Sequence, residues 1–346
     1  MTKKIAVLGT GANGSCISAD LIRAGYDVTM IDQWPAHVEK MRHDGLTISM
    51  PDEELHVRVN AYHLCDDCML HIIFDVVLLC VKAYDTRWAC ELIKPYLAPD
   101  GILVGVQNGM TVDDIIDIVG ADRTIGCVVE LASEMFEPGR VKRSIPPSRA
   151  WFGLGAVDPA MQDRVQEIAD IMKHAGRVGF PEKIISAKWM KLIVNSMSMG
   201  PQAMLGLNGS EAVKLPGVRE IMLRCGGEAL AAGQSKGYTI EPIFGLKRED
   251  IEGSNDLLEM LLDKIMAAVG PTAHDTVVQD HMKGRNSEVD LINGAVFEEN
   301  TRRGRPSKAN QMIVEMSRRI HAGEIKADPS NLAAATELLA RLDAGA

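Results

Sequence analysis

The sequence predicts an α/β domain with a parallel, doubly wound sheet, followed by an all-α domain. Short apolar runs alternate with helical patterns as far as about residue 180, which is typical of βαβ units with right-handed crossovers. After that point only the periodicity of helices remains. The chain has 346 residues, and single cores rarely grow beyond about 250–300 residues. We therefore expect two domains, 1–180 and 181–346, divided near Phe180 and Pro181.

The first domain is expected to open with a strand. The continuous apolar run "IAVLG" (Ile5–Gly9) is typical of a strand buried on both faces. Asp85 is placed to cap the helix that starts at Thr86, and Thr111 opens a further short helix. The other predicted elements are strands over 26–32, 75–82 and 101–109, short strands and turns over 123–155, and helices over 14–24, 86–97 and 159–175.

The second domain is expected to be helical throughout. No internal repeat or low-complexity segment interrupts it. The predicted helices cover residues 183–199, 218–236, 255–268, 287–302, 308–322 and 331–342.

Composition and charge limit the possible partners. The chain is 46% hydrophobic and 24% charged, with a formal net charge of −10. An acidic protein repels nucleic acid and anionic membranes, so we expect neither as a partner, whereas a locally basic pocket can still bind a small anion. No apolar run is long enough to predict a transmembrane helix. Because the first strand starts so early, we expect no signal peptide and a cytoplasmic protein.

The cysteines do not predict a disulfide framework. Their number is seven, which is odd, and their scatter fits reduced thiols in the cytoplasm. Cys65, Cys68 and His71 cluster in "CDDCMLH". This segment has half of a zinc-binding pattern, but no second Cys/His pair with ligand spacing follows. We therefore expect no metal, and a surface turn with two free thiols.

A glycine-rich segment directly follows the first predicted strand and opens a helix. In "GTGANG", Gly9, Gly11 and Gly14 have the G-x-G-x-x-G spacing. In this context the first glycine permits a tight turn, the second admits a pyrophosphate, and the third lets helix and strand pack closely. The helix N-terminus favours phosphate charge. The sequence therefore predicts a Rossmann dinucleotide site formed by Gly9, Gly11, Ala12, Asn13 and Gly14.

Asp32 ends the second predicted strand, where a carboxylate can accept hydrogen bonds from ribose hydroxyls. The same charge repels a 2′-phosphate, and the next residue is Gln33 rather than arginine. The sequence therefore favours NAD(H) over NADP(H). NADP(H) stays open as an alternative, because His37, Lys40 and Arg42 are close in sequence.

The predicted helix Lys183–Met199 places two polar side chains on one face. Lys191 and Asn195 are four residues apart, so they lie about 40° apart around the helix axis. The other side chains of this turn are largely apolar, which indicates a buried helix. A buried ammonium needs a carboxylate partner or a cleft. We expect Lys188, three residues earlier, to be a surface charge.

Four further segments carry a resemblance to a known family: "CVKAYDT" with Lys82, "VQNGM" with Asn108, "KWMKLIVNSM", and "SEVDLING". Together with the glycine loop they resemble the ketopantoate reductase family over roughly Lys4 to Arg319. The resemblance implies a helical domain like the C-terminal domain of 6-phosphogluconate dehydrogenase. It also implies reduction of a 2-oxo acid to a 2-hydroxy acid with a nicotinamide cofactor.

The resemblance assigns roles to single residues. Lys191 would be the catalytic general acid and base, and Glu288 its acidic partner. Asn195 and Thr276 would bind substrate. Lys82 and Asn108 would line the cofactor near the nicotinamide and ribose, with Asn108 also near the substrate.

The sequence departs from the family pattern in the substrate region. Met199 stands one turn after Asn195, where the family has a second substrate-binding asparagine. "GRPSKAN" replaces the family's P-T-P-type turn, and Gln33 stands where NADP-dependent members carry arginine. These departures leave the nicotinamide chemistry intact and leave open whether the substrate is ketopantoate or a relative with a less polar arm.

The sequence is also compatible with other interpretations of these residues. Lys191 could reach solvent along its stem, Asn195 could satisfy core backbone groups, Glu288 could pair with Arg285, and Thr276 could cap a helix. A dehydrogenase of the 6-phosphogluconate or opine kind would keep this architecture, and a non-catalytic NAD-binding redox sensor would need only the glycine loop. A homodimer is the expected assembly.

Overall fold

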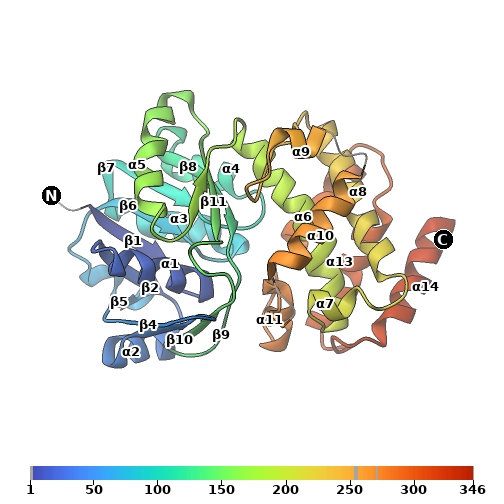
Figure 1. The fold of residues 1–346 in the computed structure, drawn as a ribbon, viewed down its shortest axis with the longest axis horizontal. Coiled ribbons are helices and arrows are strands. Elements are labelled where there is room, and N and C mark those ends of the chain that lie inside the picture. The colour runs from blue at the N-terminus through green and yellow to red at the C-terminus, as the bar shows by residue number, and fades with distance from the viewer. Residues whose placement is uncertain (1–2, 253–255, 270–271, 346) are drawn as a thin grey trace. The chain divides into compact units, whose positions relative to one another are not determined.

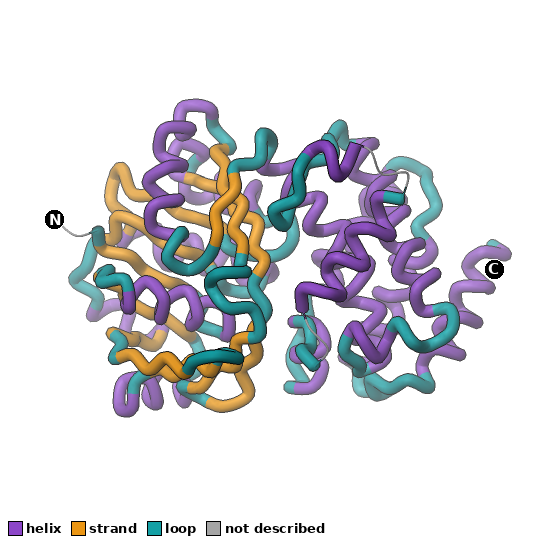
Figure 2. Tube along the Cα trace, in the orientation of Figure 1, coloured by secondary structure: helices purple, strands orange, loops and turns teal. Residues whose placement is uncertain are grey.

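The computed structural model describes residues 3–252, 256–269 and 272–345, apart from a few side chains. Figure 1 shows the path of the chain, and Figure 2 shows its helices and strands. The chain forms two compact units. The first contains residues 1–188 and 242–245, and the second contains residues 189–241 and 246–346.

The chain passes between the units inside a helix. Helix α6 (Ile184–Leu205) starts in the first unit and continues in the second. The segment 242–245 returns to the first unit, where the Phe244 ring packs edge-on against Trp151 with centroids 6.3 Å apart.

An eight-stranded sheet forms the centre of the first unit. Its strands are β1 (Lys4–Leu8), β2 (Asp27–Asp32), β5 (Asn60–His63), β6 (Phe74–Leu79), β7 (Leu97–Gly105), β8 (Thr124–Glu130), β11 (Trp151–Ala156) and β12 (Arg177–Gly179). Their order is β12-β11-β8-β7-β6-β1-β2-β5. Neighbours are parallel except that β11 runs antiparallel to β8. Because the chain proceeds in opposite directions from β1, the sheet has the switch point of a doubly wound fold, and the predicted fold class is confirmed.

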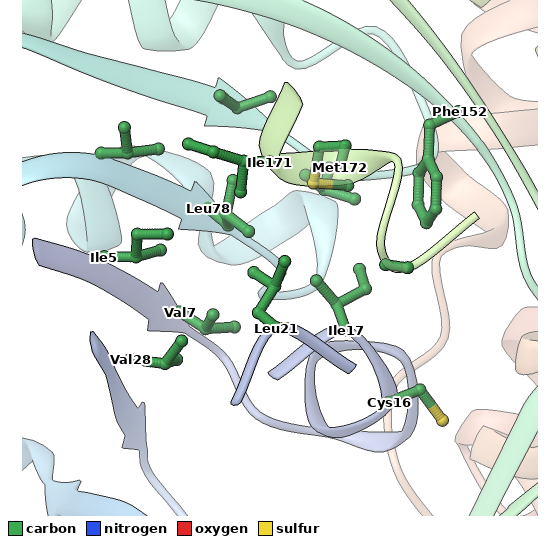
Figure 3. Packing of buried hydrophobic residues seen from close by; sticks show 14 of the residues in the cluster. Ile5, Val7, Cys16, Ile17, Leu21, Val28, Leu78, Phe152, Ile171 and Met172 are labelled. Atoms are coloured by element: carbon green, nitrogen blue, oxygen red, sulfur yellow. The ribbon is translucent and has the colours of Figure 1, made fainter. Parts of the chain in front are cut away.

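Helices cover both faces of this sheet. Helices α1 (Ala12–Arg23) and α5 (Gln162–Met172) share one core with Ile5 and Val7 of β1, as Figure 3 shows. Helices α3 (Thr86–Ile93) and α4 (Val112–Val119) share the other core with Ala6 and Leu8. Alternate residues of β1 thus enter opposite cores, which explains why the strand reads as an unbroken apolar run.

A second sheet of four short strands packs against α1. Its strands are β3 (Leu46–Ser49), β4 (Glu54–Val57), β9 (Ser133–Glu137) and β10 (Arg140–Arg143), in the order β4-β3-β10-β9. Buried Arg143 ties this sheet to the helices beside it, because it donates to Asp20 of α1 and to the carbonyl oxygen of Ala175 after α5 (2.9 Å), as well as to that of Ile145 (2.7 Å). The sequence did not predict β3, β4 or the helix before them, α2 (Pro35–Asp44).

The described residues of the second unit form helices and contain no strand, which confirms the predicted helical domain. Besides α6, the helices are α7 (Gly209–Ala212), α8 (Val218–Ser235), α9 (Arg248–Glu252), α10 (Leu257–Val269), α11 (Thr276–Met282), α12 (Val289–Arg302), α13 (Lys308–His321) and α14 (Asn331–Ala344). The predicted start of α10 at Asn255 lies outside the described residues. Across the described chain, no helix combines the length and apolar character needed to cross a bilayer.

Two predicted boundaries are wrong. Helix α6 does not stop at Met199 but continues through Pro201 to Leu205. Full burial of Ala203, Met204 and Leu205 outweighs the hydrogen bond lost at the proline.

The other wrong boundary lies between α3 and β7. Helix α3 ends at Ile93, a 3₁₀ turn follows (η3, Lys94–Tyr96), and β7 starts at Leu97. Asp85 occupies the N-cap position of α3 as predicted, but its carboxylate caps no backbone N–H. It accepts instead from the indole of Trp88 (2.7 Å).

Candidate active site

The glycine loop between β1 and α1 has the geometry of a phosphate-binding turn. Gly9 has φ +90°, and a Cβ there would lie 2.5 Å from the backbone nitrogen of Val81. A Cβ on Gly14 would lie 2.2 Å from the carbonyl oxygen of Gly9. Gly11, at the N-cap of α1, has no atom within 4 Å of the place where its Cβ would be. Gly9 and Gly14 therefore serve the turn and the packing, whereas Gly11 leaves open space at the helix N-terminus.

Side chains from other elements hold this loop. The Ser15 hydroxyl (2.6 Å) and His37 Nε2 (2.9 Å) both donate to the carbonyl oxygen of Thr10. Asn13 Oδ1 accepts from the Ser133 hydroxyl of β9 (2.6 Å). Ala12 and Asn13 are half-buried in the first turn of α1. The roles of His37 and Ser133 cannot be predicted from local sequence patterns, because both contacts join segments far apart in the chain.

Asp32 ends β2 at the same edge of the sheet. Its carboxylate is nearly buried and accepts from the Thr10 hydroxyl (3.2 Å) and from the backbone N–H of Trp34 (2.9 Å). These two bonds fix the carboxylate beside the glycine loop. Each oxygen can accept a further hydrogen bond, which a ribose hydroxyl could donate.

The basic residues near Asp32 in sequence are engaged elsewhere. His37 is 0% exposed and contacts the glycine loop. Lys40 pairs with Asp44 (2.6 Å). Arg42 binds Glu39 (2.9 Å) and Asp66, and its Nε donates to the Ala61 carbonyl oxygen (2.8 Å).

Lys82 and Asn108 follow β6 and β7 and are half-buried. In the sheet these strands continue the series β7-β6-β1-β2. Because parallel strands present their carboxyl ends at one edge, the segments that carry Lys82, Asn108, Asp32 and the glycine loop leave the sheet on the same side.

In the second unit, helix α6 carries the predicted Lys191–Asn195 pair. All residues from 186 to 205 are described, and all are buried except Lys191 and Met199, which are half-buried. Asn195 is 1% exposed and lies four residues from each of them. Lys191, Asn195 and Met199 therefore lie along one stripe of the helix, half-buried at the ammonium and thioether ends and buried at the amide between them.

Glu288 and Thr276 lie at the starts of two other helices. Glu288 is 3% exposed and occupies the N-cap position of α12, although its side chain accepts no capping bond there. Thr276 is the first residue of α11 and does not cap it, because Asp275 accepts from the Val277 and Val278 N–H groups (2.8 and 3.0 Å). The Thr276 hydroxyl contacts Met199 Sδ (3.9 Å).

The "SEVDLING" segment also has a structural role. Asn293 Nδ2 donates to the carbonyl oxygen of Ser196 (3.0 Å) and to Asn310 Oδ1 (2.9 Å), which ties α12 and α13 to α6 next to Asn195. Asp290 pairs with Arg318 (2.8 Å). Close packing depends on Gly200, whose Cβ would lie 2.3 Å from Ile313 Cγ2.

The prediction for Lys188 is wrong. This lysine is 3% exposed, and its ammonium donates to the carbonyl oxygens of Gln107 (3.0 Å) and Cys127 (3.1 Å) in the first unit. A sequence window around Lys188 cannot show these contacts, since both acceptors are distant in the chain.

Several of the thiols are buried in the core. Burial raises the pKa of Cys16 and of Cys127 to about 12, so both thiols stay protonated near neutral pH. No group of three or more His, Cys, Asp or Glu side chains is placed to hold a metal ion within the described part of the chain. Cys65 is exposed, and the side chain of Cys68 lies outside the described residues.

Comparison with known proteins identifies the family. The family model "Ketopantoate reductase PanE/ApbA" matches residues 5–156, and its C-terminal counterpart matches residues 183–321. The chain belongs to the ketopantoate reductase family. It is accordingly an oxidoreductase that acts on a CH–OH group.

Individual relatives cover almost the whole chain. A 2-dehydropantoate 2-reductase of Mesorhizobium japonicum is 29% identical, covering 92% of this chain and 97% of its own. The crystal structure of a ketopantoate reductase from Ralstonia eutropha is 25% identical, with a TM-score of 0.77 over 92% of this chain and 99% of its own. The ternary structure of D-mandelate dehydrogenase with NADH and anilino(oxo)acetate has a TM-score of 0.81 at 20% identity, over 92% and 99%.

Proposed function

We propose that this oxidoreductase interconverts a 2-oxo acid and a 2-hydroxy acid with NAD(H), using Lys191 as general acid and base. The observation that carries the proposal is the accessible stripe of α6. Within twenty successive positions that are otherwise buried, Lys191 is one of two residues that are half-buried. A helix with an accessible lysine next to a buried asparagine amide is suited to binding a carbonyl oxygen.

The first unit fits a dinucleotide. The open space at Gly11 lies at the N-terminus of α1, where backbone N–H groups and the helix dipole favour a pyrophosphate. The Asp32 carboxylate has acceptor capacity left for ribose hydroxyls. Lys82 and Asn108, at the same edge of the sheet, would hold the nicotinamide end. When bound, the nicotinamide supplies the hydride.

Residues of the second unit would act on the substrate. Negative charge grows on the carbonyl oxygen during reduction, and Lys191 would donate first a hydrogen bond and then a proton to it. In the oxidative direction the neutral amine would accept the hydroxyl proton. Asn195 would donate from its amide to the substrate, and the buried carboxyl of Glu288 would orient Lys191. Thr276 would border the substrate on the side of Met199.

NAD(H) is favoured over NADP(H) on electrostatic grounds. The Asp32 carboxylate lies where a 2′-phosphate would add two negative charges nearby. The three basic residues that follow it have other partners, as described above, and Gln33 is exposed and neutral. We therefore expect NADPH to bind more weakly than NADH, as direct titration of both cofactors would show.

The substrate arm is proposed to be apolar. Met199 presents a thioether at the accessible end of the α6 stripe, and the Thr276 hydroxyl is directed to its sulfur. A thioether is a weak hydrogen-bond acceptor and no donor, so it suits a hydrocarbon arm better than a hydroxylated one. D-Mandelate, which names one structural neighbour, is itself a 2-hydroxy acid with an apolar arm.

Substitution of Lys191 tests the proposed chemistry. Lys191→Met should lower kcat by at least about 100-fold, since a lost transition-state donor costs about 3–4 kcal/mol. The dissociation constant for NADH should stay the same, because Lys191 is assigned to the substrate. Lys264→Met is the matched control, a half-buried lysine of the same unit, and should have wild-type kinetics. NADH oxidation by Lys191→Met at the wild-type rate would refute the assignment.

We further expect a cytoplasmic homodimer. Leu291 and Met282 of the second unit are exposed apolar side chains that a symmetric contact would cover. Light scattering across a dilution series would give the assembly, and a monomer at every concentration would contradict it.

A further inference from the structure

The buried ammonium of Lys188 is not accounted for by the proposed chemistry. Burying a lysine is costly unless its charge is well solvated by hydrogen bonds, and an apolar residue would fill the same space at lower cost. Its two identified acceptors are backbone oxygens of the β7–β8 region, Gln107 just after β7 and Cys127 within β8. The ammonium therefore acts on the backbone at the carboxyl end of the sheet.

The first of these contacts fixes the orientation of Asn108. The carbonyl oxygen of Gln107 belongs to the peptide group that joins Gln107 to Asn108. Since a peptide group is planar, a hydrogen bond that holds its oxygen also sets the direction of the Asn108 N–H and Cα. Lys188 thus determines how the half-buried Asn108 leaves the end of β7.

The side chain of Gln107 fixes the backbone next to Lys82 in the same way. Gln107 Nε2 donates to the carbonyl oxygen of Val81 (2.9 Å) and to the Thr86 hydroxyl (3.0 Å). The Val81 oxygen belongs to the peptide group that joins Val81 to Lys82. Both protons of the Gln107 amide are therefore used on the turn that carries Lys82.

The rest of that turn is held as well. The Thr86 hydroxyl donates to the Ala83 carbonyl oxygen (2.7 Å), and the Asp85 N–H donates to the Lys82 carbonyl oxygen (2.9 Å). The successive carbonyl oxygens of Val81, Lys82 and Ala83 are each engaged. The turn after β6 and the turn after β7 are thereby linked by one hydrogen-bond network that starts at Lys188.

We propose that Lys188 is a positioning residue for the nicotinamide end of the cofactor. It acts through Gln107 on Asn108 and Lys82, and the inference rests on the proposed function in assigning those two residues to that end. The hydrogen bonds just described involve neither the glycine loop nor Asp32. Loss of Lys188 should therefore weaken binding of the nicotinamide half of NADH and leave binding of the adenosine half unchanged.

A comparison of two ligands tests this separation. In Lys188→Met the dissociation constant for NADH should rise about tenfold, whereas that for ADP-ribose, which lacks the nicotinamide, should not change. The kcat with a 2-oxo acid should fall by about 10- to 100-fold, since small misplacements of reacting groups are costly. Lys183→Met, which alters an exposed lysine next to the start of α6, should have no effect, and Lys188→Arg, which keeps the donors, should restore most of the NADH affinity.

A second variant keeps the test decisive if Lys188→Met does not fold. Thr86→Val removes, at the far end of the network, the hydroxyl that accepts from Gln107 and donates to Ala83. It should raise the NADH dissociation constant about threefold without changing that for ADP-ribose. Equal weakening of both ligands would show a merely structural role, and unchanged binding of both would also overturn the proposal. If the wild-type protein binds NADH but reduces no 2-oxo acid, the proposed function fails, while the ligand comparison still decides the role of Lys188.

Discussion

The two units present their candidate ligand-binding groups in different ways. In the first unit the groups are largely backbone: a glycine loop, peptide groups at strand ends, and side chains that hold those peptides. In the second unit they are side chains on one stripe of α6 and at the starts of α11 and α12. In the first unit the residues of the site therefore also maintain the fold. In the second unit other residues maintain the fold, and the site consists of side chains attached to it. Substitutions should show this difference: changes in the tightly packed parts of the first site should also lower stability, whereas in the second unit the site and the stability can be changed separately.

The largest expected effect is at Gly14. A methyl group there would meet the Gly9 carbonyl oxygen at 2.2 Å, so the turn must shift. Gly14→Ala should lower the free energy of unfolding by about 3 kcal/mol and abolish NADH binding, as measured by denaturant titration and by NADH fluorescence.

Gly11→Ala is the matched comparison. No atom lies within 4 Å of the new methyl group, so the free energy of unfolding should change by less than about 1 kcal/mol. NADH affinity should still fall by about tenfold or more, because the methyl group occupies the space left for the pyrophosphate. Full NADH affinity in Gly11→Ala would show that the dinucleotide does not bind over this loop.

Glu228 of the second unit tests whether stability can be lowered there without a change in activity. Its carboxylate is largely buried and accepts from the Ala309 N–H (2.9 Å), the Asn310 N–H (3.0 Å), Asn310 Nδ2 (2.7 Å) and the Ser307 hydroxyl (3.0 Å). Glu228→Gln puts an amide N–H₂ against some of these donors and should cost about 2 kcal/mol of unfolding free energy. The kcat measured below the unfolding transition should not change. A parallel fall in kcat would mean that scaffold and site are no more separable here than in the first unit.

The same difference decides what could be predicted from sequence. The glycine loop and Asp32 were found because their spacing is local and the strand before them is unambiguous. The stripe of Lys191 and Asn195 follows from helical periodicity. Neither motif spacing nor helical periodicity can predict the roles of Lys188, His37 and Ser133, because their partners are distant in the chain.

The missed elements have the same origin. Strands β3 and β4 are four residues long each and gain their burial from α1 and β10. Helix α6 passes Pro201 because the residues after it are buried by other helices. In each case a tertiary contact overrides the local preference on which the prediction rested.

Met199 gives a test in which activity changes and stability does not. In the wild-type protein, phenylglyoxylate should be reduced with a kcat/KM about 10- to 100-fold above that of ketopantoate, because the thioether is only a weak acceptor for a substrate hydroxyl. Met199→Asn should narrow that ratio by about tenfold, which is about 1.4 kcal/mol, with the unfolding free energy unchanged. Thr276→Val removes the hydroxyl that contacts the sulfur but keeps the shape, so comparing the two variants separates the effect of the thioether from that of the neighbouring hydroxyl. An unchanged ratio in Met199→Asn would exclude this residue from the substrate arm.

The smallest expected effect is a pH dependence at His37. Its Nδ1 accepts from the Gly139 N–H (2.9 Å) and its Nε2 donates to Thr10 (2.9 Å), so the neutral ring is the form that fits. Burial lowers the pKa of His37 below its ordinary value of 6.5. The unfolded chain therefore binds a proton more readily, and the stability contributed by His37 is complete above pH 6.5 and is lost as the pH falls below it. The slope can reach about 1.4 kcal/mol per pH unit, and His37→Gln should remove it from unfolding curves measured between pH 7.5 and 5.5.

His281 of the second unit is a buried histidine that should contribute less than His37 to the pH dependence of the unfolding free energy. Burial also lowers the pKa of His281, with a further contribution from His321. Its Nδ1 donates to the Ala203 carbonyl oxygen (3.2 Å), and protonation of the ring keeps that bond, whereas protonation of His37 sets two donors against each other at Gly139. His281→Gln should therefore change the pH dependence of unfolding less than His37→Gln does. An equal or larger change in His281→Gln would mean that burial alone, and not the loss of the hydrogen bond from Gly139 to His37, sets the response to acid.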